Sequence, residues 1–347
     1  MALTSILNVR YRGLASCVPK NVVSNFDCPP EQRSERERLV RNIGIETRRI
    51  CHSWQCFSDL AVVAAEKLLV ELGWERDDVD ALIVVTQSPD YLMPGSAILI
   101  QDRLKLRTSI PAFDINLGCS GYPYGLYVLG SMLTSGAIRR GLVLVGDKSA
   151  WLPDSLLPLF SDCGTATALE YDTNAPPMHF DLNSDGSGYR AIMMPVGGAR
   201  ERTDFYHFNP QNAEGSEKRR PVDLILDGAA VLNFSIARVP VAVKQICETA
   251  ATPLADIDYL VLHQANRMIN ETIRKKLGLA AEKVPSTLHE FGNTSSASIP
   301  LTMTARIRED LTLNGRKSLL CGFGIGLSWA SCILETDRIC MPALLEA

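Results

Sequence analysis

The sequence predicts an α/β protein in which two halves of one plan form five layers, helix–sheet–helix–sheet–helix. Three observations predict it: the order of elements repeats, the strand-like runs are apolar throughout, and each half contains a long helix without charge. Strands buried on both faces read as continuous apolar runs. We place the boundary between the halves after residue 172, so that they span residues 1–172 and 173–347.

The repeat comprises a helix, a buried strand, a short strand led by proline, an uncharged helix and a closing buried strand. In the first half these segments are residues 61–73, 79–87, 110–121, 119–138 and 140–148. In the second half they are residues 241–251, 257–265, 284–295, 293–305 and 316–324. Because the strand and turn segments correspond at nearly constant offset, the order indicates duplication.

The two uncharged helices are expected to pack between the sheets as a central layer. Residues 115–138 carry no charge and are long enough to span a bilayer. Their glycines, Pro123 and hydroxyl groups favour the alternative, a helix buried on all sides in a protein without a membrane segment. The duplication also gives Cys119 and Asn293 equivalent places, at the starts of these two helices.

Composition limits the function. The 347 residues carry a net charge of −4 and are 46% hydrophobic, which excludes a mainly disordered chain. The small acidic excess argues against a nucleic-acid-binding protein. The ten cysteines have no repeating spacing, and a chain of this length does not need disulfides. Arg10 and Arg12 interrupt the N-terminal apolar stretch, so we expect no secretory signal. Together these features predict a cytoplasmic location.

Cys119 follows a strand and a glycine in DINLGCSG. At the N-terminus of a buried helix the macrodipole favours the thiolate, which makes Cys119 a candidate nucleophile. The alternative is a small buried hydrophobic residue, the common role of a free cysteine.

Three further features have both a functional and a structural interpretation. His263 ends the apolar strand IDYLVLH, where active groups of α/β sheets lie, but a histidine at a strand end is often structural. Asn293 in FGNTSSAS is either a catalytic amide or a helix N-cap. The turn CGFGIGLSW, residues 321–329, could line an oxyanion site with backbone N–H groups. His289, in the strand expected before Asn293, is left unassigned.

Together, Cys119, His263 in HQAN, Asn293 in GNTSSAS and the turn GFGIGLSW resemble the thiolase-fold condensing enzymes. Within them the chain is most similar to the 3-oxoacyl-[acyl-carrier-protein] synthase III family, from about Tyr11 to Leu334. The resemblance implies a thiolase-like fold and an acyltransferase that needs no metal or organic cofactor.

The resemblance also implies a role for each residue. Cys119 would take the acyl group from an acyl thioester, and the amides of Cys119 and Ile325 would hold the oxyanion. A malonyl thioester would then lose CO₂, with His263 and Asn293 hydrogen-bonding the enolate oxygen. Attack of the carbanion on the acyl-enzyme would give a 3-oxoacyl thioester.

The chain departs from the family where coenzyme A would be held. Arg38 and Asn42 stand at the places of a tryptophan and an arginine that clamp the adenine. The arginine expected after LVLVGD is missing from KSAWLPDSLLPLF, and Arg267 lies one place before the usual basic residue. We therefore expect Arg38 and Arg267 to bind substrate and the acyl donor to be an acyl carrier protein, which is acidic.

Met93, in the apolar stretch after VVTQSPDY, is expected to reach the substrate pocket of a partner subunit in a homodimer. Three alternatives remain open. The chain could be a plant-type polyketide synthase, an acyltransferase that passes the acyl group to an alcohol or amine without decarboxylation, or a silent subunit of a heterodimer.

Overall fold

The computed structural model describes residues 2–149, 152–212 and 218–347, which form two large β-sheets, with helices between and outside them, and three small two-stranded sheets. The six-stranded sheet has the order β17-β2-β8-β7-β5-β6, and the five-stranded sheet has the order β1-β9-β16-β15-β14. The first consists of β2 (Val9–Val18), β5 (Ala81–Val85), β6 (Ala112–Ile115), β7 (Arg140–Asp147), β8 (Cys163–Tyr171) and β17 (Leu345–Glu346). The second consists of β1 (Ala2–Ile6), β9 (Met178–Ser184), β14 (Tyr259–Leu262), β15 (Gly315–Gly324) and β16 (Ser328–Asp337).

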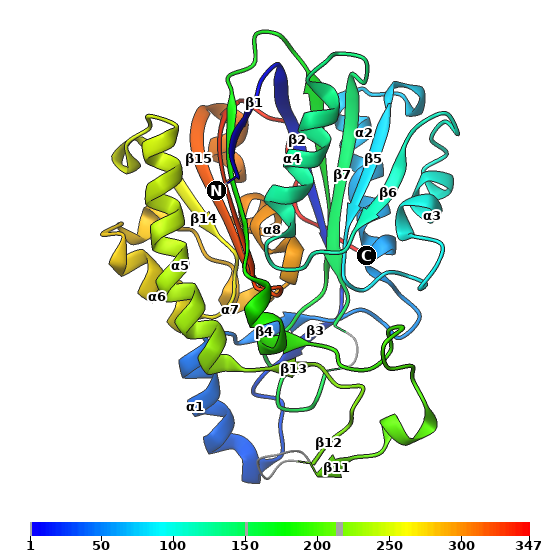
Figure 1. Cartoon of the computed structure of the whole chain (residues 1–347), viewed down its shortest axis with the longest axis vertical. Helices are drawn as coiled ribbons and strands as arrows, with labels where there is room; N and C mark the ends of the chain where they lie inside the picture. Colours follow the sequence, from blue (N-terminus) through cyan, green and yellow to red (C-terminus); the bar gives the residue numbers. More distant parts are fainter. Residues whose placement is uncertain (1, 150–151, 213–217) are drawn as a thin grey trace.

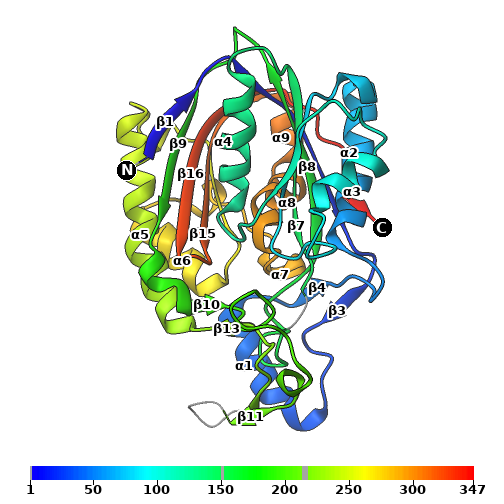
Figure 2. The ribbon, with the colours of Figure 1, turned by 45° about the vertical axis from the view of Figure 1, so that its right-hand side comes forward.

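The predicted five layers are confirmed (Figures 1 and 2). The helices α4 (Gly121–Leu133) and α8 (Ser298–Arg306) lie between the sheets. The outer helices are α2 (Phe57–Leu72) and α3 (Ser96–Arg103) on the six-stranded sheet and α5 (Gly228–Thr249) and α6 (Arg267–Lys276) on the five-stranded sheet. One apolar core contains residues of both sheets and both central helices, so the two halves share it.

Residues 115–138 therefore contain a buried central helix. Glycine lets α4 approach the six-stranded sheet, because a Cβ atom at Gly125 would lie 2.8 Å from Val85 and 2.9 Å from Val143. Among the described helices, the one that is long and apolar enough to cross a membrane, by length and composition, is instead α5. Its buried residues, which include Val239 and Val243, pack on the five-stranded sheet in one core cluster with β14 and β15.

Because several strands pair in parallel, their carboxyl ends lie together at one end of the sheets. β5 pairs in parallel with β6 and β7, and β14 pairs in parallel with β15. Their carboxyl ends face a cap formed by α1 (Arg33–Ile43) and by the short strands β3 (Val22–Ser24), β4 (Thr47–Arg49), β10 (Ile192–Met193) and β13 (Ile225–Leu226) (Figure 1). The candidate site lies at this end of the sheets, beyond the carboxyl ends of the strands.

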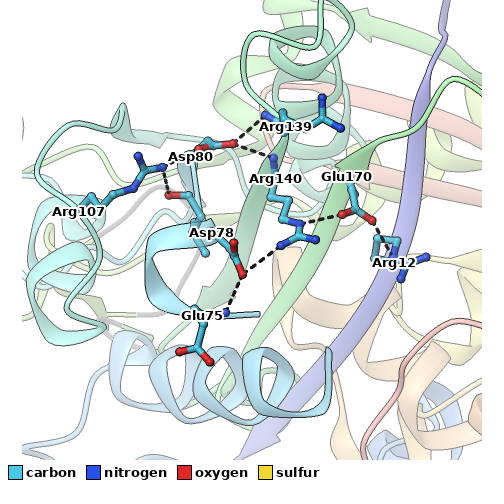
Figure 3. Close-up of polar contacts among 9 residues, drawn as sticks. Arg12, Glu75, Asp78, Asp80, Arg107, Arg139, Arg140 and Glu170 are labelled. Carbon is cyan, nitrogen blue, oxygen red and sulfur yellow. Dashed lines mark hydrogen bonds and ion pairs between the residues drawn. The ribbon is translucent and has the colours of Figure 1, made fainter. Parts of the chain in front are cut away.

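At the opposite end of the six-stranded sheet, charged side chains connect neighbouring strands (Figure 3). The Asp80 carboxylate accepts hydrogen bonds from the amides of Arg139 and Arg140 and from the Arg107 guanidinium, at 2.8, 3.1 and 2.6 Å. The Arg140 guanidinium pairs with Asp78 at 3.0 Å and with Glu170 at 2.7 Å. These contacts join the starts of β5 and β7 to the end of β8.

The prediction of a short strand within residues 284–291 is wrong. The segment contains the single-turn helix α7 (Leu288–Phe291) instead, and the five-stranded sheet ends at β14. The Gln264 side-chain oxygen accepts hydrogen bonds from the Thr287 amide at 3.0 Å and from the Ser286 hydroxyl at 2.9 Å. Because a side chain satisfies these donors, the segment turns over the end of β14 without pairing with it.

The first and last strands of the chain each belong to the sheet that is formed mainly by the other half. β1 pairs antiparallel with β9 in the five-stranded sheet, and β17 pairs in parallel with β2 in the six-stranded sheet. The expected boundary at residue 172 falls between the end of β8 and the start of β9, but the first strand of the chain belongs to the second sheet and the last strand to the first sheet.

Candidate active site

Cys119 lies two residues before α4, in contact with the glycine turn that follows β15. A Cβ atom at Gly324, which has φ 154°, would lie 2.7 Å from the Cys119 Cβ and 2.9 Å from its Sγ. Only glycine fits at this position without moving the cysteine. The predicted association of Cys119 with residues 321–329 is therefore present in the structure.

Burial raises the pKa of the Cys119 thiol to about 11, while hydrogen bonds from the Ile325 backbone and from its own backbone act in the opposite direction. The expectation of a thiolate is thus wrong for the resting protein, because loss of solvent outweighs the donors around the sulfur. Both backbone groups proposed to hold the oxyanion, those of Cys119 and Ile325, nevertheless act on this sulfur.

His263 follows β14 directly and is 2% exposed. Its Nδ1 lies 2.7 Å from the Ser298 Oγ on α8, and its ring meets Phe323 edge to face at 5.5 Å between centroids. Burial lowers the pKa of His263 to about 3, although a hydrogen bond with the Ser295 backbone acts against this. The imidazole is therefore neutral at physiological pH.

Asn293, 5% exposed, is bound between two segments. Its backbone N–H donates to the Leu159 carbonyl at 3.0 Å, and its side-chain Oδ1 accepts from the backbone N–H of Ser295 at 2.8 Å. The second bond resembles helix capping, but Thr294 occupies the N-cap position of the short helix η7 (Ser295–Ala297) that precedes α8. No described residue accepts a hydrogen bond from the Asn293 Nδ2, so this amide can donate to a ligand.

Ser295 connects the three predicted residues. Its backbone amide donates to the Asn293 Oδ1 at 2.8 Å, its backbone acts to raise the pKa of His263, and its side chain acts to lower the pKa of the Cys119 thiol. The structure thus brings Cys119, His263 and Asn293, which are 174 positions apart in the sequence at the extremes, to one place at the carboxyl edge of the sheets.

Comparison with known proteins agrees with this geometry. Residues 113–186 match the family "3-Oxoacyl-[acyl-carrier-protein (ACP)] synthase III" and residues 247–336 match its "C terminal" part. The beta-ketoacyl-[acyl-carrier-protein] synthase III of Caldanaerobacter subterraneus subsp. tengcongensis is 31% identical, over 94% of this chain and 97% of that protein. The chain belongs to the 3-oxoacyl-[acyl-carrier-protein] synthase III family.

Solved structures confirm the thiolase-like fold of this family. A 3-oxoacyl-(acyl-carrier protein) synthase from Burkholderia xenovorans superposes with a TM-score of 0.91 at 36% identity, covering 99% of both chains. The priming beta-ketosynthase of the R1128 polyketide biosynthetic pathway superposes with a TM-score of 0.80 at 25% identity, covering 96% of this chain and 97% of the other. The predicted family and enzyme class, an acyltransferase of the condensing type, are therefore confirmed.

The residues expected to bind substrate are less closely grouped. A cavity of about 500 Å³ beside α1 is lined by Arg33, Arg41 and Arg267 together with Glu37 and Glu46. Arg38 and Asn42 are exposed on α1 and are not among its lining residues. Met93 is 84% exposed in the loop before α3. In the segment that lacks the family's arginine, residues 150–151 lie outside the described residues.

Sequence reasoning missed Asp147, the last residue of β7. It is 9% exposed, and its Oδ1 accepts hydrogen bonds from the Thr86 hydroxyl at 3.0 Å and from the Gln87 amide at 2.7 Å. Its Oδ2 accepts from the Ser296 hydroxyl at 2.9 Å. The available signal was an acidic residue at the carboxyl end of the apolar strand LVLVGD.

Proposed function

We propose that this member of the synthase III family transfers an acyl group from a thioester to Cys119 and condenses it with a malonyl thioester. The observation that carries the proposal is the meeting of three segments at one site: Gly324 lies against Cys119, the preceding residue Phe323 packs on the His263 ring, and the Asn293 Oδ1 binds the first residue of η7, whose Ser296 faces the start of α4. The backbone groups of Cys119 and Ile325 would stabilise the oxyanion of the acyl-transfer step.

The neutral state of His263 supports its role in decarboxylation. A neutral imidazole and a carboxamide can both donate a hydrogen bond to the enolate oxygen that develops as CO₂ leaves. Since this step needs charge stabilisation on one oxygen, the proposed reaction requires no cofactor. The ten free thiols agree with the proposed cytoplasmic location.

The test separates the two steps. Intact-protein mass spectrometry after incubation with an acyl thioester should detect one acyl group in the wild-type protein and none in Cys119→Ala. His263→Ala and Asn293→Ala should still acylate but lose CO₂ release from malonyl thioester roughly 10²–10³-fold. Normal decarboxylation by His263→Ala would refute its role. Acyl transfer to an alcohol or amine without CO₂ release would establish the alternative activity.

We propose an acyl carrier protein as the carrier of the substrate. Arg33, Arg41 and Arg267, from α1 and α6, line one cavity, and Arg38 adds a further exposed charge on α1. Arg33 pairs with Glu37 at 3.3 Å, and Glu46 also lines the cavity, so the arginines leave a small positive excess. This excess suits an acidic carrier protein, whereas Asn42 offers no guanidinium to a nucleotide.

The acyl-donor preference is tested with one acyl group on two carriers. We expect kcat/KM for acylation of Cys119 to be higher with the carrier-protein thioester than with the coenzyme A thioester, and this advantage to fall at high salt. Arg267→Gln should reduce the carrier-protein value and leave the coenzyme A value nearly unchanged. Equal values, or a preference for coenzyme A, would contradict the proposal.

We further propose a homodimer formed through the edge of the six-stranded sheet. β6 is an edge strand, and its Phe113 is 41% exposed. The apolar loop that contains Leu92 and Met93 is held beside it, because the Asp114 carboxylate accepts hydrogen bonds from the amides of Ser96 and Ala97, both at 2.7 Å. An unpaired strand next to exposed apolar side chains is a surface that a second copy can cover.

A further inference from the structure

The first residue of α8, Ser298, meets the segment that follows β14. It is 1% exposed, and its Oγ lies 2.7 Å from the His263 Nδ1. The same Oγ accepts the backbone N–H of Gln264 at 3.3 Å. One buried hydroxyl on a central helix therefore contacts two consecutive residues that come directly after β14. The reaction proposed above assigns this hydroxyl no part.

The hydrogen-bonding capacity of the Ser298 hydroxyl decides the direction of its bond to His263. A serine hydroxyl has one proton to donate and two lone pairs that accept, and the Gln264 N–H occupies one lone pair. If the His263 Nδ1 carried a proton, it would occupy the other, and the Ser298 proton would have no acceptor among the described residues. A buried hydroxyl without an acceptor is disfavoured. Ser298 therefore donates, and Nδ1 accepts.

The direction of this bond fixes where the imidazole carries its proton. A neutral imidazole has one N–H, and the bond made by one ring nitrogen sets the state of the other. Burial keeps His263 neutral, because it lowers the pKa to about 3. The Ser295 backbone acts to raise this pKa, as an acceptor of a ring proton does, which is compatible with a proton on Nε2. Since Nδ1 accepts from Ser298, the proton lies on Nε2.

The backbone and packing contacts of His263 place the ring but do not choose between its nitrogens. Its backbone N–H donates to the Cys321 carbonyl at 2.8 Å, and its carbonyl accepts from the Asn270 Nδ2 at 3.0 Å. Its ring meets Phe323 edge to face. A shift of the proton from one nitrogen to the other would leave these three contacts unchanged. The bond to Ser298 does distinguish the tautomers, because it needs a lone pair on Nδ1.

We propose that Ser298 is a positioning residue that holds His263 in its Nε2–H tautomer for the decarboxylation step, which deepens and rests on the proposed function. In that step the C–C bond to the malonyl carboxylate breaks, its electron pair forms the enolate, and CO₂ leaves. The Nε2–H donates a hydrogen bond to the enolate oxygen, and its proton stays on nitrogen. The opposite tautomer would present a lone pair to this oxygen and repel it. Ser298 acts through His263 and does not contact substrate.

The same tautomer separates His263 from the acylation step. The Cys119 thiol is protonated at rest and must lose its proton as it attacks the thioester. An imidazole whose Nδ1 is bound to Ser298 and whose Nε2 carries a proton has no lone pair to offer to that thiol. His263 is therefore reserved for decarboxylation, and loss of the Ser298 hydroxyl should affect the two steps unequally.

The experiment compares Ser298→Ala, which removes the hydroxyl, with Ser298→Thr, which keeps it. The matched control is Ser235→Ala on α5, where the serine is likewise buried and its Oγ donates to the Val231 carbonyl at 2.7 Å. Each full-length protein is assayed for CO₂ release from a malonyl thioester and for acylation of Cys119 in a single turnover. The tautomer is read from the nitrogen NMR shifts of the isotope-labelled His263 ring, which are assigned with His263→Gln.

The wild-type spectrum should show a protonated Nε2 and an unprotonated Nδ1 in His263. Without the hydroxyl, Ser298→Ala should populate the Nδ1–H form and release CO₂ roughly 10–10²-fold more slowly. Its acylation rate should stay within about twofold of the wild type, because His263 takes no proton in that step. Ser298→Thr should restore both the tautomer and CO₂ release, and Ser235→Ala should match the wild type in every measurement.

Three results would overturn the inference alone. They are a protonated Nδ1 in the wild-type spectrum, an unchanged tautomer with wild-type CO₂ release in Ser298→Ala, and equal losses of acylation and CO₂ release that Ser298→Thr does not restore. The first needs no variant, so it stays decisive if Ser298→Ala does not fold. A wild-type protein that released no CO₂ would refute the proposed function instead, and its spectrum would still report the tautomer.

Discussion

At the scale of single residues, the site depends on how far each group is removed from water. His263 and Cys119 both keep their neutral forms because desolvation disfavours charge. A neutral His263 can donate a hydrogen bond to an enolate oxygen. A neutral Cys119 thiol must lose its proton to an acceptor before or during its attack on the thioester. The chemistry of this site is thus set by burial as much as by residue type.

Burial of His263 predicts how stability depends on pH. Its pKa is lower in the folded protein, about 3, than in an unfolded chain, about 6.5, so the stabilisation is present above pH 6.5 and is lost as the pH falls towards 3. The free energy of unfolding should fall by about 1.4 kcal/mol per pH unit more in the wild type than in His263→Gln below pH 6. Urea unfolding of both proteins between pH 7 and pH 4 measures this, and parallel curves would contradict it.

Sequence motifs were sufficient to predict that Cys119, His263 and Asn293 act at one site, because the residue types and their spacing carry the family signal. They were not sufficient for the state of the thiol or for Asp147. Both depend on which side chains meet from separate elements, such as Thr86 and Ser296 around one carboxylate. Tertiary contacts of this kind produce no local sequence pattern from which they could be predicted.

At the scale of elements, the glycine turn after β15 sets the position of the nucleophile. Gly324→Ala should place a methyl group within 3 Å of the Cys119 Cβ and Sγ and slow acylation by roughly 100-fold, the cost of displacing a reacting atom by about 1 Å. Gly198→Ala is the control, since a Cβ there meets no atom within 4 Å. Single-turnover acylation of both variants is the measurement, and equal rates would exclude steric control by this turn.

The elements themselves were largely predictable, since long apolar runs and uncharged helices follow from burial on both faces. The exception is residues 284–291, where the sequence pattern of the first half suggested a strand. In the second half the Gln264 side chain takes up the donors that a neighbouring strand would have used. Duplication therefore predicted the order of elements better than the conformation of each copy.

At the scale of the whole molecule, the proposed homodimer gives a direct test of the β6 edge. Phe113→Asp would put a charge on this edge and should shift the protein from dimer to monomer at micromolar concentration, while the wild type sediments as a dimer. Val241→Asp, on the exposed face of α5, is a matched apolar-to-acid control and should remain dimeric. A monomeric wild-type protein would refute the proposal.

The exchange of chain ends was not predictable, because β1 has five residues and its partner β9 lies more than 170 positions away. It has a consequence for synthesis. During synthesis β1 has no partner in its sheet until β9 has followed it, and the two-residue strand β17 is added to β2 only after more than 300 further residues have been made. Cys119 emerges 144 residues before His263 and 174 residues before Asn293, so a nascent chain presents its nucleophile alone until both of these residues have followed.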